Sequence, residues 1–438
     1  MAVKLAKPKK SKSFKQVPEN DFFKSLAKIK LVKKIAIAVS GGPDSLALTI
    51  LLNKFSSLNN IRLYAISIDH GLRSSSNSEL KWLASEMKKR KINHKIIKWK
   101  DKKPTSNILS NARDKRYKLL IEECNKLNIK YLFTGHHLDD QVENMLLRLI
   151  RGSGIKGLAS LQAEFKFTNS KVKILRPLLP YPKKSLISYL ANEKQEYIID
   201  PTNFNSSHDR SRIRKVTSHL VEEGLTNIRL LNTFKYLKEA NNSINYLINT
   251  SIKNFIKVDQ NGLVSLSINK FSPLPAEIKF RSLSKILSFI GKNKNEPRSK
   301  SILNLLNKIT ATEFTNTTLS NCLILKQKKL IFFLPETSRQ IKSTKIKLDN
   351  FIWNDQYKIT MKKNHTKGLS IRYLGLAAAK KMPKKYSEGS DQRTTAALVS
   401  IWKDKKLLEV PTLGYKDTKN TSVKKIDIID IYSFFEER

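Results

Sequence analysis

Between residues 33 and 150, short continuous apolar runs alternate with segments in which apolar residues have helical spacing. Four short runs rich in Ile, Val and aromatic residues have the character of buried strands: 35–39 (IAIAV), 61–69 (IRLYAISID), 94–99 (HKIIKW) and 130–135 (KYLFTG). After each run, apolar residues recur three or four positions apart, which predicts helices over 45–55, 77–91, 108–128 and 138–150. This alternation predicts βαβ units and a parallel sheet covered by helices on both faces.

The pattern changes twice in the rest of the chain. A strand end, a proline-rich turn and a helix are predicted over 174–197, and 216–307 has mostly helical spacing. From about Thr318, short runs typical of strands return. We therefore predict an α/β protein with a basic lead-in (1–32) that includes a short helix near 20–30, an α/β domain (33–215), a mostly helical domain (216–345) and a small β-rich C-terminal domain (346–438).

The charge of the chain indicates its class of partner. Lys and Arg total 83 against 37 Asp and Glu, a formal net charge of +46. Biased codon usage accounts for Lys in place of Arg, but not for an excess of this size. Such a surface favours polyanions, so nucleic acid is the expected partner, with an anionic membrane surface as the rival.

Cysteine usage and hydropathy narrow the expected compartment. The two cysteines, Cys124 and Cys322, are far apart and form no CxxC pair, so we expect neither a disulfide framework nor a zinc or iron–sulfur site. No apolar run reaches 18 residues, and the N-terminus has no apolar signal core, so we expect no membrane segment. Together these features predict a cytoplasmic protein.

The segment SGGPDS, Ser40–Ser45, stands where the first strand gives way to a helix. Ligands of parallel sheets bind at the carboxyl ends of strands, and the free N–H groups of a helix start bind phosphate. Gly41 and Gly42 allow close backbone approach, the two serines add donors, and Pro43 suits the first helical position. Asp44 suits a Mg²⁺ ligand beside phosphates or a helix cap. The plain alternative is a strand–turn–helix with a serine N-cap.

A second concentration of polar residues follows the fourth strand. The segment GHHLDDQVEN places His136, His137, Asp139, Asp140 and Glu143 at a strand end and the first helical turn. Asp140 and Glu143 are three positions apart and share a helix face, where two carboxylates can bind an ammonium group or a metal. The alternatives are a capping box with surface acids, or a metallohydrolase, which would need further His or Asp ligands.

These motifs resemble those of one enzyme class. SGGPDS is similar to the pyrophosphate-binding SGGxDS loop of the N-type ATP pyrophosphatases. The order and spacing of the motifs between Lys33 and Lys215 resemble the tRNA(Ile)-lysidine synthetases, and the C-terminal half matches them loosely. Two departures are Asn111 where that family usually has Gln, and RSRIR where it has an RNRIR-like element. The motifs are SGGPDS, DHGLR (69–73), NARDKRY (111–117), GHHLDDQVEN (135–144), RGSGIKGL (151–158), RPLL (176–179) and DPTNFNSSHDRSRIR (200–214).

The resemblance implies ATP-dependent modification of the wobble cytidine of a tRNA(Ile) with a CAU anticodon. ATP adenylates the cytosine, free L-lysine displaces AMP, and lysidine results. It implies ATP and Mg²⁺ at Ser40, Gly41, Gly42, Pro43, Asp44, Ser45 and Asp69, with Asp44 as the metal ligand. It implies catalysis by Asp44, Arg113, Asp140 and Glu143, and substrate or tRNA binding by Arg113, Arg116, His136, Asp140, Glu143, Arg210, Arg212 and Arg214.

Relatives in this class are often dimers, so a homodimer is one expectation. Two other functions stay open at this point. The first is a tRNA thiolation enzyme of the same fold, which would need a reactive cysteine pair that the two cysteines do not supply within any motif. The second is a tRNA-binding protein without catalysis, against which the intact Ser40, Asp44, Asp140 and Glu143 argue.

Overall fold

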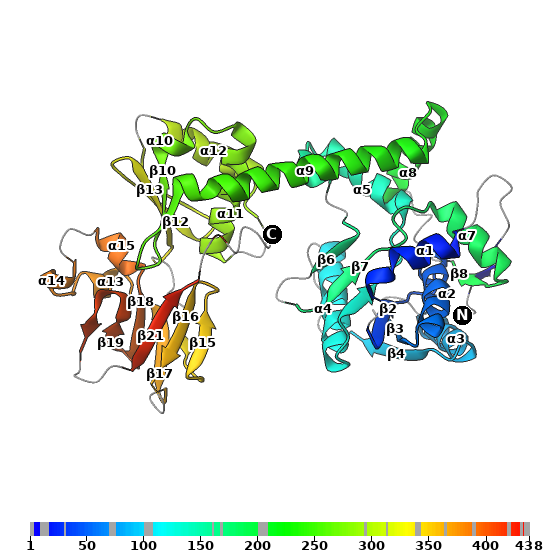
Figure 1. Cartoon of the computed structure of the whole chain (residues 1–438), viewed down its shortest axis with the longest axis horizontal. Coiled ribbons are helices and arrows are strands. Elements are labelled where there is room, and N and C mark those ends of the chain that lie inside the picture. The colour runs from blue at the N-terminus through cyan, green and yellow to red at the C-terminus, as the bar shows by residue number, and fades with distance from the viewer. Residues whose placement is uncertain are drawn as a thin grey trace. The chain divides into compact units, whose positions relative to one another are not determined.

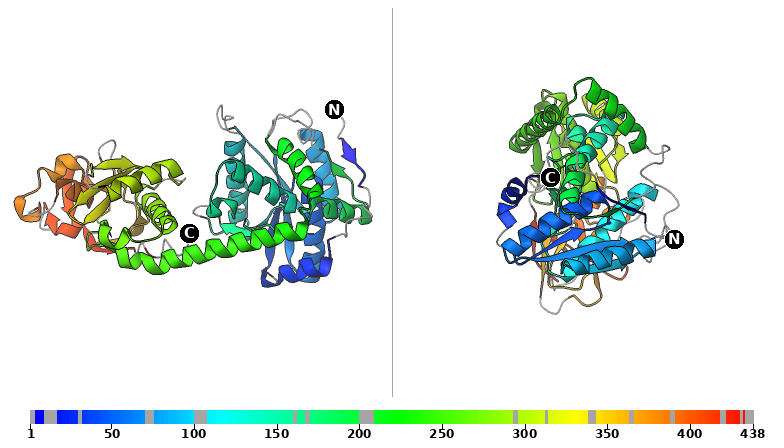
Figure 2. Two further views of the ribbon diagram at one scale, coloured as in Figure 1. Left: turned by 90° about the horizontal axis from the view of Figure 1, so that it is seen from above. Right: turned by 90° about the vertical axis from the view of Figure 1, so that its right-hand side faces the viewer.

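The computed structural model divides the chain into two compact units, 1–241 and 242–438, which are described separately (Figure 1). Helix α9 (Asn227–Phe255) includes the point of division as a single helix (Figure 2). The predicted domain boundaries at 32, 215 and 345 stay predictions. The structure describes residues 4–8, 17–29, 32–69, 76–99, 108–159, 162–166, 170–199, 209–292, 296–311, 314–337, 343–362, 366–387, 391–417, 422–429 and 432.

The first unit is built on a six-stranded sheet of order β4-β3-β2-β5-β7-β6. All neighbours pair in parallel except β6, which is antiparallel to β7. The predicted parallel α/β architecture is therefore confirmed, with one antiparallel edge strand added. The strands are β2 (Lys34–Ala38), β3 (Arg62–Asp69), β4 (Asn93–Lys98), β5 (Tyr131–Phe133), β6 (Glu164–Lys166) and β7 (Lys173–Leu175).

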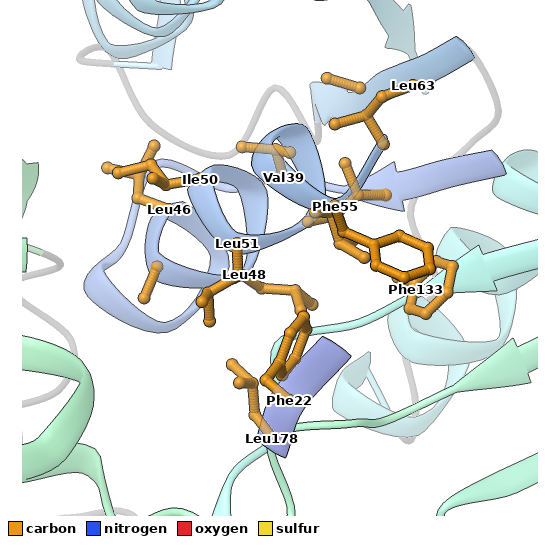
Figure 3. Close-up of a cluster of buried hydrophobic side chains, with 14 of the residues drawn as sticks. Phe22, Val39, Leu46, Leu48, Ile50, Leu51, Phe55, Leu63, Phe133 and Leu178 are labelled. Carbon is orange, nitrogen blue, oxygen red and sulfur yellow. The ribbon is translucent and has the colours of Figure 1, made fainter. Parts of the chain in front are cut away.

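Helices cover both faces of this sheet, because successive strand residues point to opposite faces. Ile35 and Ile37 pack with α2 in one buried cluster, while Ala36 packs with α4 in another. Figure 3 shows part of the first cluster, including Leu51 and Phe55 of α2. The helices are α1 (Glu19–Ser25), α2 (Pro43–Leu58), α3 (Ser76–Lys89), α4 (Ile108–Lys126), α5 (Leu138–Ile150), α6 (Ile155–Leu158), α7 (Lys183–Asn192) and α8 (Asp209–Glu222), with a 3₁₀ turn at Ala27–Ile29.

A short antiparallel pair lies beside the start of α2. Strand β1 (Leu5–Ala6) pairs with β8 (Tyr197–Ile198). The Ile198 N–H donates to the Gly41 carbonyl at 2.9 Å, so β8 is attached to the turn between β2 and α2. This hydrogen bond joins the residue that follows the 174–197 region to the first predicted functional loop.

The described part of the second unit contains two five-stranded sheets, one of them covered by helices, and a three-stranded sheet, all antiparallel. The order β11-β12-β13-β10-β9 packs against α10 (Ile268–Phe271), α11 (Ala276–Gly291) and α12 (Ser299–Thr310) in one core. Its strands are β9 (Ile256–Val258), β10 (Val264–Ser267), β11 (Thr317–Leu319), β12 (Cys322–Gln327) and β13 (Leu330–Pro335).

The other two sheets confirm the predicted β-rich C-terminal region. Their orders are β14-β17-β18-β19-β20 and β15-β16-β21. The same region contains short helices α13 (Leu376–Ala379), α14 (Lys384–Ser387) and α15 (Gln392–Ala396), and a 3₁₀ turn spans Pro411–Leu413. The strands are β14 (Thr344–Lys345), β15 (Asn350–Trp353), β16 (Tyr357–Met361), β17 (Leu369–Tyr373), β18 (Val399–Lys403), β19 (Lys406–Val410), β20 (Tyr415–Lys416) and β21 (Val423–Ile428).

The hairpin of β9 and β10 lies in a stretch that was predicted to be mostly helical. The side chain of Asp259 fixes the turn between the two strands, because its Oδ1 accepts the N–H groups of Asn261 (2.8 Å) and Leu263 (2.9 Å). Gly262 adopts φ +82°, which an L side chain resists. The chain therefore reverses direction here instead of continuing as a helix.

None of the helices in the described part of the chain combines the length and apolarity needed to cross a membrane.

Candidate active site

The SGGPDS segment forms an open loop between β2 and α2. Gly42 is the N-cap of α2 and Pro43 its first residue, and no side chain caps the helix, so the plain alternative of a serine cap does not apply. Ser45 instead donates its hydroxyl to the Gly42 carbonyl at 3.0 Å, and the Ser40 N–H donates to Ser45 Oγ at 3.3 Å. The N–H groups at the start of α2 are therefore available to an anion.

Two glycines let other segments approach this loop closely. Gly41 has φ +83°, and a Cβ there would lie 2.4 Å from Ile198 Cδ1. Gly135 follows β5, and a Cβ there would lie 3.0 Å from the backbone of Asp44 and Ser45. The loop after β2 and the loop after β5 thus meet backbone to backbone, as expected for the carboxyl edge of a parallel sheet.

A buried histidine stands at the centre of the acidic residues. His137, 3% exposed, has its Nε2 3.6 Å from Asp44 Oδ1 and 3.5 Å from Asp140 Oδ2, and its Nδ1 3.7 Å from Asp139 Oδ2. Burial by itself lowers the pKa of His137, but contact with Asp44 and the charges of Asp140, Asp44 and Asp139 raise that pKa overall to about 9. The imidazole is therefore a cation that joins both loops near neutral pH.

Asp44 has one cation near each of its two carboxylate oxygens. Lys183 Nζ lies 3.8 Å from Asp44 Oδ2. Burial raises the pKa of Asp44, but His137 and Lys183 outweigh burial and lower it overall. Oδ1 is buried and faces His137 Nε2 at 3.6 Å, beyond hydrogen-bond distance, and it accepts no hydrogen bond from the described residues. A buried carboxylate oxygen of this kind suits Mg²⁺, which takes one or two carboxylates together with substrate phosphates.

The described residues contain no group of three or more His, Cys, Asp or Glu side chains arranged to bind a metal. A Mg²⁺ ion at this loop would be held by Asp44, with substrate phosphates and water as its other ligands. Mg²⁺ at Asp44 is thus compatible with the residues present.

Asp140 and Glu143 lie on α5 as predicted, but both are already engaged. Asp140 Oδ2 accepts the His137 N–H at 3.1 Å, which completes a capping box at the start of α5. Glu143, 3% exposed, accepts from Arg214 Nε of α8 at 2.5 Å, while its buried Oε2 has no hydrogen-bond partner in the described residues. The two carboxylates therefore share a helix face, and Glu143 Oε2 is the buried oxygen that can still accept a hydrogen bond from a ligand.

A second group of predicted residues gathers near the end of β7. The arginines 113, 116 and 176 lie close enough to His136 for their positive charges to lower its pKa, and Arg176 directly follows β7. Arg113 also acts on the pKa of Arg176. The fold thus brings the NARDKRY, GHHLDDQVEN and RPLL motifs together.

The other predicted residues are placed only in part. Asp69 ends β3, at the same sheet edge as the SGGPDS loop. Arg212 is exposed on α8. The side chain of Arg210 and the segments 70–75 and 200–208, which belong to two of the motifs, lie outside the described residues.

Three residues of this site, Arg176, Lys183 and the central His137, did not enter the predicted set. Lys183 starts α7 far from the other motifs in sequence, and only the fold brings it to Asp44. Arg176 belongs to the RPLL motif, whose position directly after β7 was the available signal. His137 was recognised in its motif, but its three carboxylate neighbours come from two loops.

Comparison with known proteins identifies the class. A model of the PP-loop domain matches residues 11–220. The tRNA(Ile)-lysidine synthase of Wolbachia pipientis wMel is 30% identical over 403 residues, covering 90% of this chain and 92% of that protein. The chain belongs to the tRNA(Ile)-lysidine synthase family. It is accordingly a PP-loop enzyme of the ligase class with an ATP-binding domain, as the motifs predicted.

Further relatives carry the same family name. The tRNA(Ile)-lysidine synthase of Rickettsia prowazekii (strain Madrid E) is 32% identical over 358 residues, which cover 81% of each chain. Among solved structures, the U34-tRNA thiolase NcsA from Methanococcus maripaludis with its [4Fe-4S] cluster is 24% identical, with a TM-score of 0.44 over 50% of this chain and 78% of that chain. In the protein described here, Cys124 and Cys322 are free and buried.

Proposed function

We propose that this enzyme ligates free L-lysine to C2 of the wobble cytidine in tRNA(Ile) with a CAU anticodon. The observation that carries the proposal is the uncapped start of α2, which includes Asp44, in a chain that aligns with 92% of a tRNA(Ile)-lysidine synthase. The site combines an anion-binding loop with carboxylates, which matches a reaction that uses ATP and a cationic amino acid.

In the first step, O2 of the cytosine attacks the α-phosphorus of ATP. The O2–P bond forms, the bond between the α-phosphorus and the bridging oxygen breaks, and pyrophosphate leaves. The N–H groups of the SGGPDS loop and the hydroxyls of Ser40 and Ser45 bind the β,γ-phosphates. Mg²⁺, when bound at Asp44, supplies positive charge to the leaving pyrophosphate. Arg113 stabilises the charged α-phosphate, and Asp69 contributes to the nucleotide site.

In the second step, an amino group of lysine attacks C2 of the adenylated cytosine. The attacking nitrogen is a neutral amine that releases one proton to water as the C–N bond forms, the C2–O2 bond breaks, and AMP leaves with that oxygen. Asp140 and the open oxygen of Glu143 attract the ammonium groups of lysine. Because both carboxylates are partly engaged by His137 and Arg214, their geometry is set before lysine arrives.

The positive charge of the chain serves tRNA binding. Arg210, Arg212 and the Lys-rich C-terminal region would contact the RNA backbone in a salt-dependent manner. We expect the reaction to take place in the cytoplasm, and a homodimer is compatible with these roles.

Pyrophosphate release in the absence of lysine tests the first step. With Mg-ATP, release should require the tRNA and should fail when the wobble cytidine is replaced by uridine. Asp44→Asn should abolish release and keep the folded state, whereas Glu122→Gln, an exposed carboxylate on α4, should behave as wild type. Release that ignores the wobble base, or an active Asp44→Asn, would contradict the proposal.

The lysine site needs a separate test. Asp140→Ala should raise the lysine concentration required for ligation and spare lysine-independent pyrophosphate release. Equal loss of both activities would argue against a specific lysine site. Binding of tRNA with no ATP cleavage at all would favour the binding protein without catalysis.

A further inference from the structure

A cluster of three arginines lies beside the site without carboxylate partners. Arg113 and Arg116 come from α4 and Arg176 from the end of β7 (Figure 1). No carboxylate of the described residues forms an ion pair with any of the three within 4.0 Å. Their aromatic neighbours are Tyr117, whose ring lies 5.9 Å from Arg113 Cζ and 5.6 Å from Arg116 Cζ, and Phe165, whose ring lies 4.2 Å from Arg176 Cζ.

Arg176 is the buried member of the cluster. It is 4% exposed, and Nη1 donates to the Gln162 carbonyl at 3.0 Å. Its Nε is buried without a hydrogen-bond partner in the described residues, and so is the Nε of Arg116. A buried cation with unused donors and no counter-ion is destabilising unless an anion completes the site.

The surroundings keep the cluster positive. Burial lowers the pKa of His136 to about 3, assisted by the charges of Arg176, Arg116 and Arg113, so this imidazole is neutral. The charge of Asp140 reaches Arg176, but its carboxylate is shared with His137. The positive charge of the arginines is therefore not cancelled by the described part of the chain.

We propose that Arg116 and Arg176, next to Arg113 with its role at the α-phosphate of ATP, form a subsite for a phosphodiester group of the tRNA backbone beside the nucleotide that is modified. This inference rests on the proposed tRNA substrate. Arg113 is exposed, Arg116 is half-buried and Arg176 is buried. The three positive charges therefore extend from the surface toward the interior. A strand of RNA fits that gradient, because one phosphate can enter while its neighbours stay outside.

The sheet order separates this subsite from the pyrophosphate loop. The loop follows β2 and Arg176 follows β7, with β5 between them. Two strand spacings amount to about 10 Å. The α-phosphate of ATP, being attached directly to the pyrophosphate, is the competing occupant. Arg113 is the member proposed above to act on that α-phosphate, so the test relies on Arg116 and Arg176.

Equilibrium binding separates the two sources of phosphate without requiring catalysis. The full chain is titrated with a tRNA(Ile) transcript bearing CAU and, separately, with Mg-ATP. Arg176→Gln and Arg116→Gln should weaken tRNA binding roughly 10- to 100-fold, lower the salt slope by about one, and leave the ATP Kd unchanged. Lys118→Gln, exposed on the same helix as Arg116, is the matched control and should stay close to wild type.

Two results would overturn the assignment. Weaker ATP binding with normal tRNA binding would give the subsite to the nucleotide. Unchanged affinity for both ligands, in variants with normal thermal unfolding, would remove the subsite. If Arg176→Gln fails to fold, Arg116→Gln alone decides, because Arg116 is only half-buried.

A chemical control tests the contact itself. A neutral methylphosphonate linkage, moved along the anticodon loop of the RNA, should weaken binding to wild type at one linkage next to the wobble nucleotide. The same linkage should have no effect on Arg176→Gln, or on Arg116→Gln if the first variant does not fold. An identical loss in wild type and variant would overturn the contact, whatever the outcome for lysidine formation.

Discussion

Arg214 Nε donates a hydrogen bond of 2.5 Å to Oε1 of Glu143, so an arginine that was predicted to contact RNA forms an ion pair with a buried carboxylate. Glu143 comes from α5 and Arg214 from α8, and the two positions are 71 residues apart in the chain. The pair therefore connects the predicted lysine site with the predicted RNA-binding segment. It also satisfies one oxygen of a carboxylate that burial would otherwise destabilise.

Arg214→Ala should destabilise the protein by about 1–3 kcal/mol, because it leaves the Glu143 carboxylate buried and unpaired. The figure is at the lower end of buried ion pairs, since the Arg214 side chain is 41% exposed and water can reach it. Urea unfolding measures the change. His219→Ala on the same helix removes only an exposed pair with Glu222 and should cost less than about 0.5 kcal/mol. Equal costs for the two variants would contradict the pairing.

Gly41→Ala should destabilise the protein by more than about 1 kcal/mol, because alanine resists positive φ and its Cβ would meet Ile198 Cδ1. Gly42→Ala is the matched control: Gly42 has φ −71°, and its added Cβ would meet only Ser40 Oγ at 3.8 Å. Thermal unfolding compares the two. Adding Ile198→Ala to Gly41→Ala should relieve the clash but not the backbone strain, so complete rescue would show that φ is unimportant.

The charge of His137 should make the stability of the protein without Mg²⁺ depend on pH. Because its pKa is raised from 6.5 to about 9 on folding, its stabilising contribution is complete below about pH 6.5 and is lost as the pH rises through 9. The difference in unfolding free energy between wild type and His137→Gln should therefore be largest near pH 6 and small near pH 10. Urea unfolding at several pH values measures it, and a difference that grows with pH would contradict a cationic His137.

Neither cysteine should react with thiol reagents in the folded protein. Burial raises the pKa of the Cys124 thiol to about 12 and that of Cys322 further still. At about pH 8, a thiol with a pKa near 12 is thiolate in about one molecule in ten thousand. Ellman's reagent should thus report both thiols only after unfolding. Fast labelling of the native protein would reopen sulfur transfer through cysteine.

Local sequence signals predicted the first unit well. The runs 35–39 and 61–69 became β2 and β3, and 138–150 became α5 with the same bounds, because apolar spacing and turn residues agreed there. The hairpin at Asp259–Gly262 was missed because a short turn inside a helical stretch gives little periodic signal.

The sequence motifs predicted the acidic residues of the site, but they did not predict the ion pairs that those residues form. Asp44, Asp140 and Glu143 were predicted from their own segments. Their partners Lys183 and Arg214 come from other helices, and no spacing along the chain reveals such pairs. The ion pair between Arg214 and Glu143 therefore depends on the tertiary structure, and a basic motif alone does not predict it.

The most direct test of the proposed function follows lysine itself. The purified enzyme is incubated with Mg-ATP, isotopically labelled lysine and a tRNA(Ile) transcript bearing CAU, and the RNA is treated with mild alkali, which removes aminoacyl esters. The account predicts label that survives this treatment, requires the wobble cytidine, and appears in a single modified nucleoside. ATP cleavage to AMP and pyrophosphate without stable label would contradict it and assign another nucleophile to this PP-loop enzyme.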